Sequence, residues 1–313
     1  MTVCISAVAE QDEVIVSCVD TRISTGVTSF EPLLGSKLAG LRGWTILGSG
    51  TTCYSESLVD TFSALLNEAE NNDPPIVQRL LETALRAEMP KYIAARYLTP
   101  YGMDMPAFLN SRGPSGFTDE RWNELSRLML DFSDSYDVEL LVSGWGQTQE
   151  EGGATYSPRA CLYSVSRDGV TPHSDDGFYA CGSGKEAAHS VLSFFNHERH
   201  MTLAEAIYNV ATAKFMAERT AGVGKNTVLR VATRLGEGGK RLTGYYLQSN
   251  ELNEIRELWE KDGAPRMRDG AEDTIVSIIA RHQKSQHVSI NHMVRNVNKA
   301  IKQSVSEKSE PEP

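Results

Sequence analysis

The feature that most constrains the fold is a pair of apolar segments at the start of the chain. Residues 2–9 (TVCISAVA) and 14–19 (VIVSCV) are rich in small and β-branched side chains, and four polar residues lie between them. This pattern predicts a β-hairpin. Its first strand is formed by the first residues of the chain, and any fold proposed for this sequence must accommodate a strand at that position.

The remaining elements follow in groups rather than in strict alternation. Further strands are predicted at residues 44–47, 138–143, 160–166, 178–181, 227–233 and 242–247. Apolar periodicity predicts helices at residues 55–69, 76–97, 185–197 and 203–220. Pro90 is expected to kink or end the second of these, and Thr202 and Glu205 have capping-box spacing at the start of the last. Helix pairs between groups of strands favour an α/β (α+β) fold with two sheets between helix layers.

Two regions lie outside this core pattern. Residues 99–136 begin with an irregular stretch rich in Pro and Gly and end in an amphipathic helix. We interpret them as a helical insertion whose apolar stripe must pack on its own domain or on another subunit. The stripe consists of Trp122, Leu125, Leu128, Met129 and Phe132. Residues 251–302 are predicted to be a C-terminal helical extension, with one helix ending near residue 261, and residues 303–313 a disordered acidic tail.

Composition narrows the possible functions of this 313-residue chain. Its 31 Lys and Arg against 41 Asp and Glu give a net charge of −10, which argues against nucleic-acid binding. No apolar run reaches the roughly 18 residues that a membrane helix needs, and the first residues lack the basic region of a secretory signal. Five dispersed cysteines without a CxxC pair predict buried free thiols in a reducing compartment. We therefore expect a cytoplasmic protein.

Neither a metal nor a cofactor is expected. The seven histidines form no HExxH motif, and His197 and His200 are interpreted as a solvated pair at a helix end. The segment Gly182-Ser183-Gly184-Lys185 is not a phosphate-binding loop, because Tyr179 stands where its first glycine is required and Glu186 replaces its Ser or Thr.

Thr2 is the residue with the most specific chemical potential. Threonine is small enough for the initiator Met to be removed, which would leave Thr2 at the N-terminus. A free α-amine has a pKa of roughly 8 and can accept the proton of the hydroxyl on its own residue. Nucleophile and base are then combined in one residue. Such a threonine acts only beside a cation, an oxyanion site and a cleft.

Residues that follow supply these parts in order. The second predicted strand ends at Asp20-Thr21-Arg22, Lys37 follows Asp20 by 17 positions, and Gly50 lies between a strand and a helix. Glycine at such a position lets backbone N–H groups face a ligand. In this order the residues resemble the proteasome β-subunit branch of the N-terminal nucleophile (Ntn) hydrolases. The opening Met-Thr-x-Cys, and Asp-Thr-Arg followed by Gly26-Val27, look closest to the bacterial Anbu-type homologues.

The resemblance returns along most of the chain. VELLVSGW, ACLYSVSRDGV, FYACGSGKEAA and the segment from residue 202 to 231 are similar to the central strands, turn and helix of that family. Coverage is about residues 2–250, except for the insertion at residues 99–136. The resemblance implies a four-layer αββα sandwich. It also implies a self-compartmentalising homo-oligomer, a ring or an open helical assembly, that cleaves peptide or protein substrates. An unfoldase is a further candidate partner.

The resemblance also implies a role for each site residue. Thr2 is the nucleophile, Lys37 stabilises the alkoxide, and Asp20 fixes Lys37. The Gly50 N–H binds the oxyanion and Ser183 lies near the amine. Arg22 and Glu218 are the supporting residues of this set.

Two departures keep alternatives open. Where the family has Asp and, three residues later, Ser beside the amine, this chain has Glu218 and Ala221. These changes allow a second hypothesis, a catalytically inactive scaffold subunit, and a third, a small-molecule amidase or an acyl transferase. By spacing alone, Cys4 rather than Thr2 matches the nucleophile position, because Asp20 follows Cys4 by 16 positions. Thr2 is preferred because TVCISA fits the strand pattern best from Thr2.

Overall fold

The computed structural model describes residues 2–24, 29–30, 37–71, 73–111, 118–149, 156–234 and 243–263. The chain divides into two compact units, Met1–Glu260 and Lys261–Pro313. Only Lys261–Gly263 of the second unit are described, so the helices predicted after residue 263 and the predicted tail lie outside the described residues.

The first unit contains two five-stranded antiparallel sheets. One sheet has the order β10-β1-β2-β11-β12 and the other the order β5-β6-β7-β8-β9. The first is built from β1 (Cys4–Ala9), β2 (Val14–Asp20), β10 (Phe178–Cys181), β11 (Thr227–Thr233) and β12 (Thr243–Tyr246). The second is built from β5 (Leu38–Leu41), β6 (Trp44–Gly50), β7 (Val138–Gln149), β8 (Tyr156–Ser166) and β9 (Gly169–Pro172). A short pair, β3 (Ile23–Ser24) and β4 (Ser29–Phe30), forms a third sheet.

The predicted N-terminal hairpin is confirmed. In β1 and β2, Cys4 pairs with Val19 and Ala9 with Val14. Every residue of both strands is buried, because one face of each strand lies toward the second sheet and the other toward a helix. Continuous burial explains why these strands are apolar throughout rather than at alternate positions. The edge strands β5 and β9 were not predicted, since strands of four residues with at most one buried side chain give little signal.

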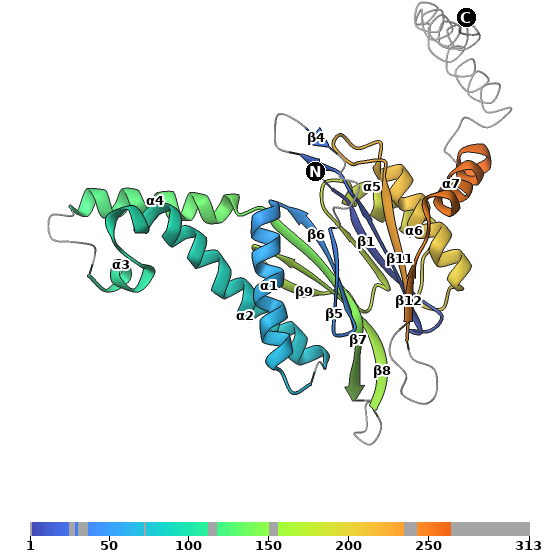
Figure 1. Ribbon diagram of the computed structural model, residues 1–313, viewed down its shortest axis with the longest axis horizontal. Coiled ribbons are helices and arrows are strands. Elements are labelled where there is room, and N and C mark those ends of the chain that lie inside the picture. Colours follow the sequence, from blue (N-terminus) through green and yellow to red (C-terminus); the bar gives the residue numbers. More distant parts are fainter. Residues whose placement is uncertain are drawn as a thin grey trace, which may run out of the picture. The chain divides into compact units, whose positions relative to one another are not determined.

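Helices cover the outer side of each sheet (Figure 1). Helices α5 (Lys185–Phe194) and α6 (Leu203–Ala217) pack on β10, β1 and β2. Helices α1 (Thr52–Glu68) and α2 (Pro74–Ile93) pack on strands of the other sheet. β1 and β10 of the first sheet contact β6, β7 and β8 of the second, and apolar side chains fill the space between them. The capping box of Thr202 and Glu205 at the start of α6 is present as predicted.

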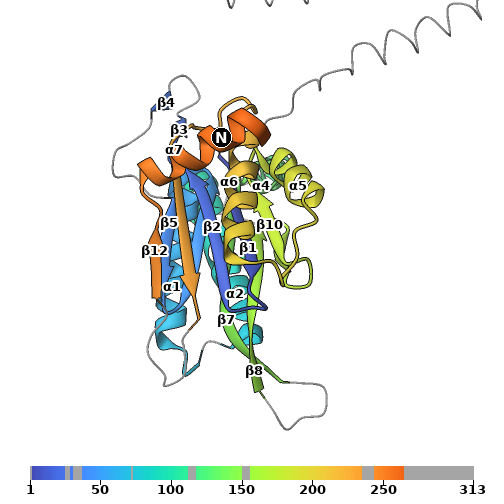
Figure 2. The same ribbon diagram turned by 90° about the vertical axis from the view of Figure 1, so that its right-hand side faces the viewer.

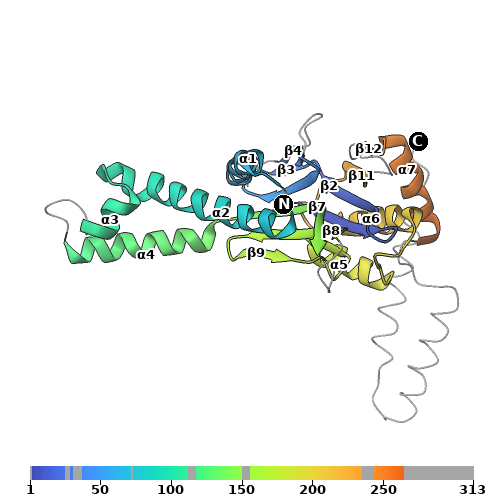
Figure 3. The ribbon, with the colours of Figure 1, turned by 90° about the horizontal axis from the view of Figure 1, so that it is seen from below.

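The region predicted to be an insertion packs on its own unit. Helix α2 continues past Pro90 to Ile93 and is followed by a π-helical turn (Ala94–Leu98) and a 3-10 turn (Thr99–Tyr101). A short helix, α3 (Met105–Ser111), was not predicted; α4 (Asp119–Ser135) was, and it lies beside α2 (Figure 3). Leu125, Met129 and Phe132 of the α4 stripe are buried in the apolar cluster that includes α1 and α2. Trp122 stacks on Phe108 with ring centroids 5.3 Å apart.

Helix α7 (Ser249–Leu258) and a π-helical turn (Trp259–Gly263) agree with the helix predicted to end near residue 261. Helix α7 packs on α6 (Figure 2). No helix among the described residues is long and apolar enough to cross a membrane.

Two predictions about individual side chains are wrong. Cys53 is exposed, because it lies on the outer face of the first turn of α1, whereas the other four cysteines are buried. His197 is buried rather than solvated. The chain turns back after α5, which places the His197 Nε2 atom 3.0 Å from the Val8 carbonyl oxygen.

The buried carboxylate of Glu88 joins α2 to α1. It accepts hydrogen bonds from Ser57 (2.5 Å), Thr61 (2.5 Å) and Lys91 (2.6 Å). Burial opposes ionisation, but these hydrogen bonds and the Lys91 charge outweigh it and lower the pKa of Glu88. A lowered pKa means that the carboxylate stabilises the folded state at neutral pH and that this stabilisation is lost as the pH falls through that pKa.

Glu88→Gln is therefore expected to lower the free energy of unfolding at pH 7 by about 1–2 kcal/mol, because the amide has no charge to pair with Lys91 and offers one acceptor oxygen instead of two. Urea denaturation at pH 7 and at pH 4 measures the effect, which shrinks at the lower pH. The control is Glu82→Gln on the same helix, whose partner Arg86 is largely exposed; it is expected to change stability by less than about 0.5 kcal/mol. Equal effects of the two variants would contradict the prediction.

Candidate active site

Thr2 and Lys37 meet at one end of the two sheets. Thr2 lies two residues before β1 and is only 3% exposed, while Lys37 immediately precedes β5. The ammonium of Lys37 donates hydrogen bonds to the Thr2 hydroxyl oxygen and to the carbonyl oxygen of Arg22. The chain thus brings a cation into direct contact with the side-chain oxygen of Thr2, although 35 positions separate the two residues.

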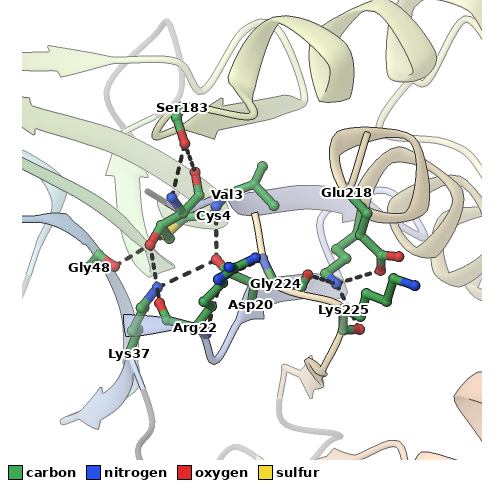
Figure 4. Close-up of polar contacts among 12 residues, drawn as sticks. Val3, Cys4, Asp20, Arg22, Lys37, Gly48, Ser183, Glu218, Gly224 and Lys225 are labelled. Atoms are coloured by element: carbon green, nitrogen blue, oxygen red, sulfur yellow. Dashed lines mark hydrogen bonds and ion pairs between the residues drawn. The ribbon is translucent and has the colours of Figure 1, made fainter. Parts of the chain in front are cut away.

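Asp20 lies beside Lys37 (Figure 4). It is at the end of β2 and is completely buried. Its Oδ1 atom is 3.5 Å from the Lys37 Nζ and accepts the Val3 N–H at 3.0 Å. Its Oδ2 atom accepts the N–H groups of Arg22 and Gly224, each at 3.1 Å. A buried carboxylate needs such compensation to stay charged. Three backbone donors and one ammonium therefore hold a negative charge beside Lys37.

The turn between β10 and α5 closes on the backbone of Thr2. The Thr2 N–H donates to the Ser183 Oγ at 3.0 Å, and the Thr2 carbonyl oxygen accepts from the Ser183 hydroxyl and from the Gly184 N–H, each at 3.2 Å. Gly182 has a φ of +87°, and a Cβ there would lie 2.4 Å from the Thr2 carbonyl oxygen. Only glycine permits this approach. Ser183 thus lies within hydrogen-bond distance of the Thr2 nitrogen.

Gly50 forms part of the wall of a cleft next to Thr2. Its φ is +91°, and a Cβ at this position would lie 2.5 Å from the Asp137 carbonyl oxygen, so a side chain does not fit. The cleft has a volume of about 390 Å³, with Thr2 and Lys37 in its lining. Apolar side chains and two carboxylates, on β5, β6 and α1, also line it: Leu38, Ala39, Ile46, Val59, Glu56 and Asp60.

Cys4, the alternative nucleophile, faces a different environment. Its side chain is completely buried and its Sγ lies 3.5 Å from the Gly48 carbonyl oxygen. Burial, with a smaller contribution from Cys181, raises the pKa of the Cys4 thiol well above its ordinary value. Because the thiolate is the reactive form, a raised pKa disfavours nucleophilic attack by Cys4. The geometry favours Thr2.

The sequence suggested that Glu218 lies beside the Thr2 amine, but its side chain contacts other residues. It caps the end of α6, and its carboxylate pairs with Lys214 at 2.5 Å and with Arg256 at 2.6 Å. Among the described contacts none joins it to Thr2 or Ser183. Ala221, the position where the family has Ser, is exposed.

Two polar residues and one glycine near this site were not identified from the sequence. Glu139 of β7 accepts the Gly182 N–H at 2.6 Å and so holds the turn that contacts Thr2. Lys214 is completely buried, and Gly224 contacts both Lys214 and Asp20. A signal existed for Lys214, because it occupies the same face of α6 as the buried Val210 and Ala217, where a lysine needs a partner.

No protein-family model and no curated protein matches this sequence. Solved structures do match. A Gly-1 mutant of Anbu from Hyphomicrobium sp. strain MC1 has a TM-score of 0.53 and 13% identity over 83% of this chain and 94% of that chain. A second Anbu structure from the same strain has a TM-score of 0.52 and 14% identity over the same shares of the two chains.

Anbu (ancestral beta-subunit) from Yersinia bercovieri gives a TM-score of 0.51 and 13% identity over 89% of this chain and 96% of that chain. At such low sequence identities, the similarity establishes only that the strands and helices are arranged in the same way. The α+β architecture with two antiparallel sheets agrees with it. This chain has the fold of the Anbu proteasome-like structures.

Proposed function

We propose that this protein is a proteasome-like threonine hydrolase of peptide or amide bonds, with Thr2 as its N-terminal nucleophile after removal of Met1. One observation carries the proposal: the Lys37 ammonium, held beside the buried Asp20, contacts the Thr2 hydroxyl at the wall of a cleft. The likeness to the Anbu structures supports the fold on which this chemistry would rest. Helix packing on the outer sides of both sheets supports a four-layer αββα sandwich of Ntn type.

In the first step, the Thr2 Oγ attacks the carbonyl carbon of the scissile amide and its proton passes to the Thr2 α-amine. Lys37 stabilises the developing alkoxide, and the Gly50 N–H binds the negative oxygen of the tetrahedral intermediate. The C–N bond then breaks, and the α-amine returns the proton to the leaving amine. The product of this step is an ester between the substrate acyl group and Thr2.

In the second step, water attacks the ester carbonyl while the α-amine takes one of its protons. The tetrahedral intermediate collapses, the C–O bond to Thr2 breaks, and the proton returns to the Thr2 oxygen. The acid product leaves and the threonine is regenerated. Ser183, within hydrogen-bond distance of the Thr2 nitrogen, keeps that nitrogen oriented for the proton transfers of both steps.

The proposal extends to organisation. Residues 2–250 form the hydrolase domain, with the insertion at residues 99–136, and residues 251–302 the extension. Exposed large apolar side chains on separate elements support assembly of the protein with copies of itself. The assembly would be a ring or an open helical oligomer in the cytoplasm, with an unfoldase as a further partner. The exposed side chains are Leu109, Leu130, Phe194 and Leu258. An inactive scaffold is the second candidate, favoured by the absence of a hydroxyl at Ala221.

Thr2→Ala is expected to lower the rate of amide hydrolysis by at least about 10⁴-fold, because the nucleophile is removed. Lys37→Ala is expected to lower it by at least about 100-fold. Hydrolysis of a panel of fluorogenic peptide amides by the full chain measures both. Cys4→Ala is the matched control and retains activity close to that of the wild type. Full activity in Thr2→Ala together with loss in Cys4→Ala would assign the nucleophile to Cys4.

The cleft also suggests which side chain the substrate carries. Its lining combines aliphatic residues with Glu56 and Asp60, one turn apart on α1. Among the described residues neither carboxylate has a cationic partner. An aliphatic stem ending in a cation, as in Lys or Arg, complements such a surface.

We therefore expect Glu56→Gln to lower kcat/KM for arginine and lysine amides about fivefold, and to leave that for norleucine amides within about twofold of the wild type. The control is Glu68→Gln, an exposed carboxylate on the same helix that does not line the cleft. The same loss for norleucine and arginine substrates would contradict a charge-based preference.

A further inference from the structure

A second charged cluster lies behind the proposed catalytic residues and consists of Lys214, Glu218 and Arg256. The Lys214 Nζ donates to the Glu218 Oε1 at 2.5 Å and to the carbonyl oxygens of Gly224 and Lys225 at 2.7 and 3.0 Å. An ammonium has three N–H donors, so all of them are used. Burial lowers the pKa of Lys214, and the adjacent Glu218 carboxylate acts against this shift and favours the charged form.

Gly224 connects this cluster to the catalytic residues. Its carbonyl oxygen accepts from Lys214, and its N–H donates to the Asp20 Oδ2 at 3.1 Å (Figure 4). Gly224 belongs to the sequence Ala-Gly-Val-Gly-Lys, whose two glycines leave the backbone with few restraints of its own. The hydrogen bond from the Lys214 ammonium to the Gly224 carbonyl oxygen restrains this segment where its N–H meets Asp20.

Arg256 brings helix α7 into the same arrangement. Its two Nη atoms contact the two carboxylate oxygens of Glu218 at 2.6 and 2.8 Å, a two-pronged geometry that fixes the orientation of the carboxylate. Its guanidinium also lies 4.0 Å from the ring centroid of Phe215 on α6. Arg256 thus anchors α7 on α6 and holds Glu218 toward Lys214.

We propose that Lys214, Glu218 and Arg256 are positioning residues, which couple helix α7 to the catalytic centre by holding Gly224 against Asp20 and thereby Lys37 against Thr2. Asp20 keeps the Val3 and Arg22 donors when the Gly224 donor is lost. Loss of the cluster therefore displaces the carboxylate without releasing it, and lowers activity without abolishing it. The catalytic part of this inference rests on the proposed function.

The test compares Arg256→Gln with Glu257→Gln in the full chain. Both changes remove one charge from α7, but Glu257 is exposed and lies outside the cluster. Two quantities are measured: kcat and KM for an amide substrate, and the rate at which a small activated ester acetylates Lys37, followed by peptide mass spectrometry. Lys91, which is 64% exposed, is the internal reference for acetylation.

Arg256→Gln is expected to lower kcat about tenfold with KM within about twofold, since misplacement of catalytic groups affects the chemical step. It is also expected to raise the acetylation rate of Lys37 relative to Lys91, because an amine no longer held against Asp20 and Thr2 is more accessible. Arg256→Lys keeps the charge but loses the two-pronged contact, and restores part of the loss. Glu257→Gln changes neither quantity.

The inference requires both changes in Arg256→Gln; unchanged kcat or unchanged Lys37 acetylation overturns it. Lys214→Met is a stronger version of the same test, and where it does not fold, the Arg256 variants decide. A wild-type protein that shows no turnover would instead refute the proposed function. In that case kcat cannot be compared, and the acetylation rate of Lys37 in Arg256→Gln alone decides whether α7 positions that lysine.

Discussion

The site depends on a single buried negative charge, the carboxylate of Asp20. It is completely shielded from water, and three backbone N–H groups and the Lys37 ammonium compensate it. Removing one partner of a buried charge pair costs about 3–5 kcal/mol. The Asp20 carboxylate therefore stabilises the position of the Lys37 ammonium, in which it contacts the Thr2 hydroxyl. The same carboxylate ties together Val3, Arg22 and Gly224, three backbone segments that are distant in the sequence.

Much of the fold followed from local pattern. The N-terminal hairpin, α6 with its capping box, and β11 at Thr227–Thr233 were predicted because continuous apolar strands and capped periodic helices carry strong local signals. The edge strands β5 and β9 and the short α3 were missed, because short elements with few buried residues depend on their neighbours. Cys53 and His197 were misjudged for a related reason: the exposure of one side chain depends on which face of a helix packs inward and on how the chain turns after a helix.

For the candidate site, the sequence indicated the ordered set of Thr2, Asp20, Lys37, Gly50 and Ser183, and the structure brings these residues together. It did not indicate how Glu218 is used, because its contact with Lys214 and Arg256 requires α7 to pack beside α6. Nor did it indicate Glu139, since one carboxylate in a strand carries no local signal of the turn it holds. Ordered motifs were predictable, whereas contacts between distant elements were not.

The most direct measurement is the intact mass of the untagged protein before and after incubation with a threonine-directed epoxyketone. This reagent reacts with a hydroxyl and a free α-amine on the same residue, so it labels only an N-terminal threonine. Loss of Met1 and a single adduct, located at Thr2 by peptide mapping, is the result that threonine catalysis predicts. A retained Met1, or a free Thr2 that is never modified, would contradict it and favour the inactive scaffold.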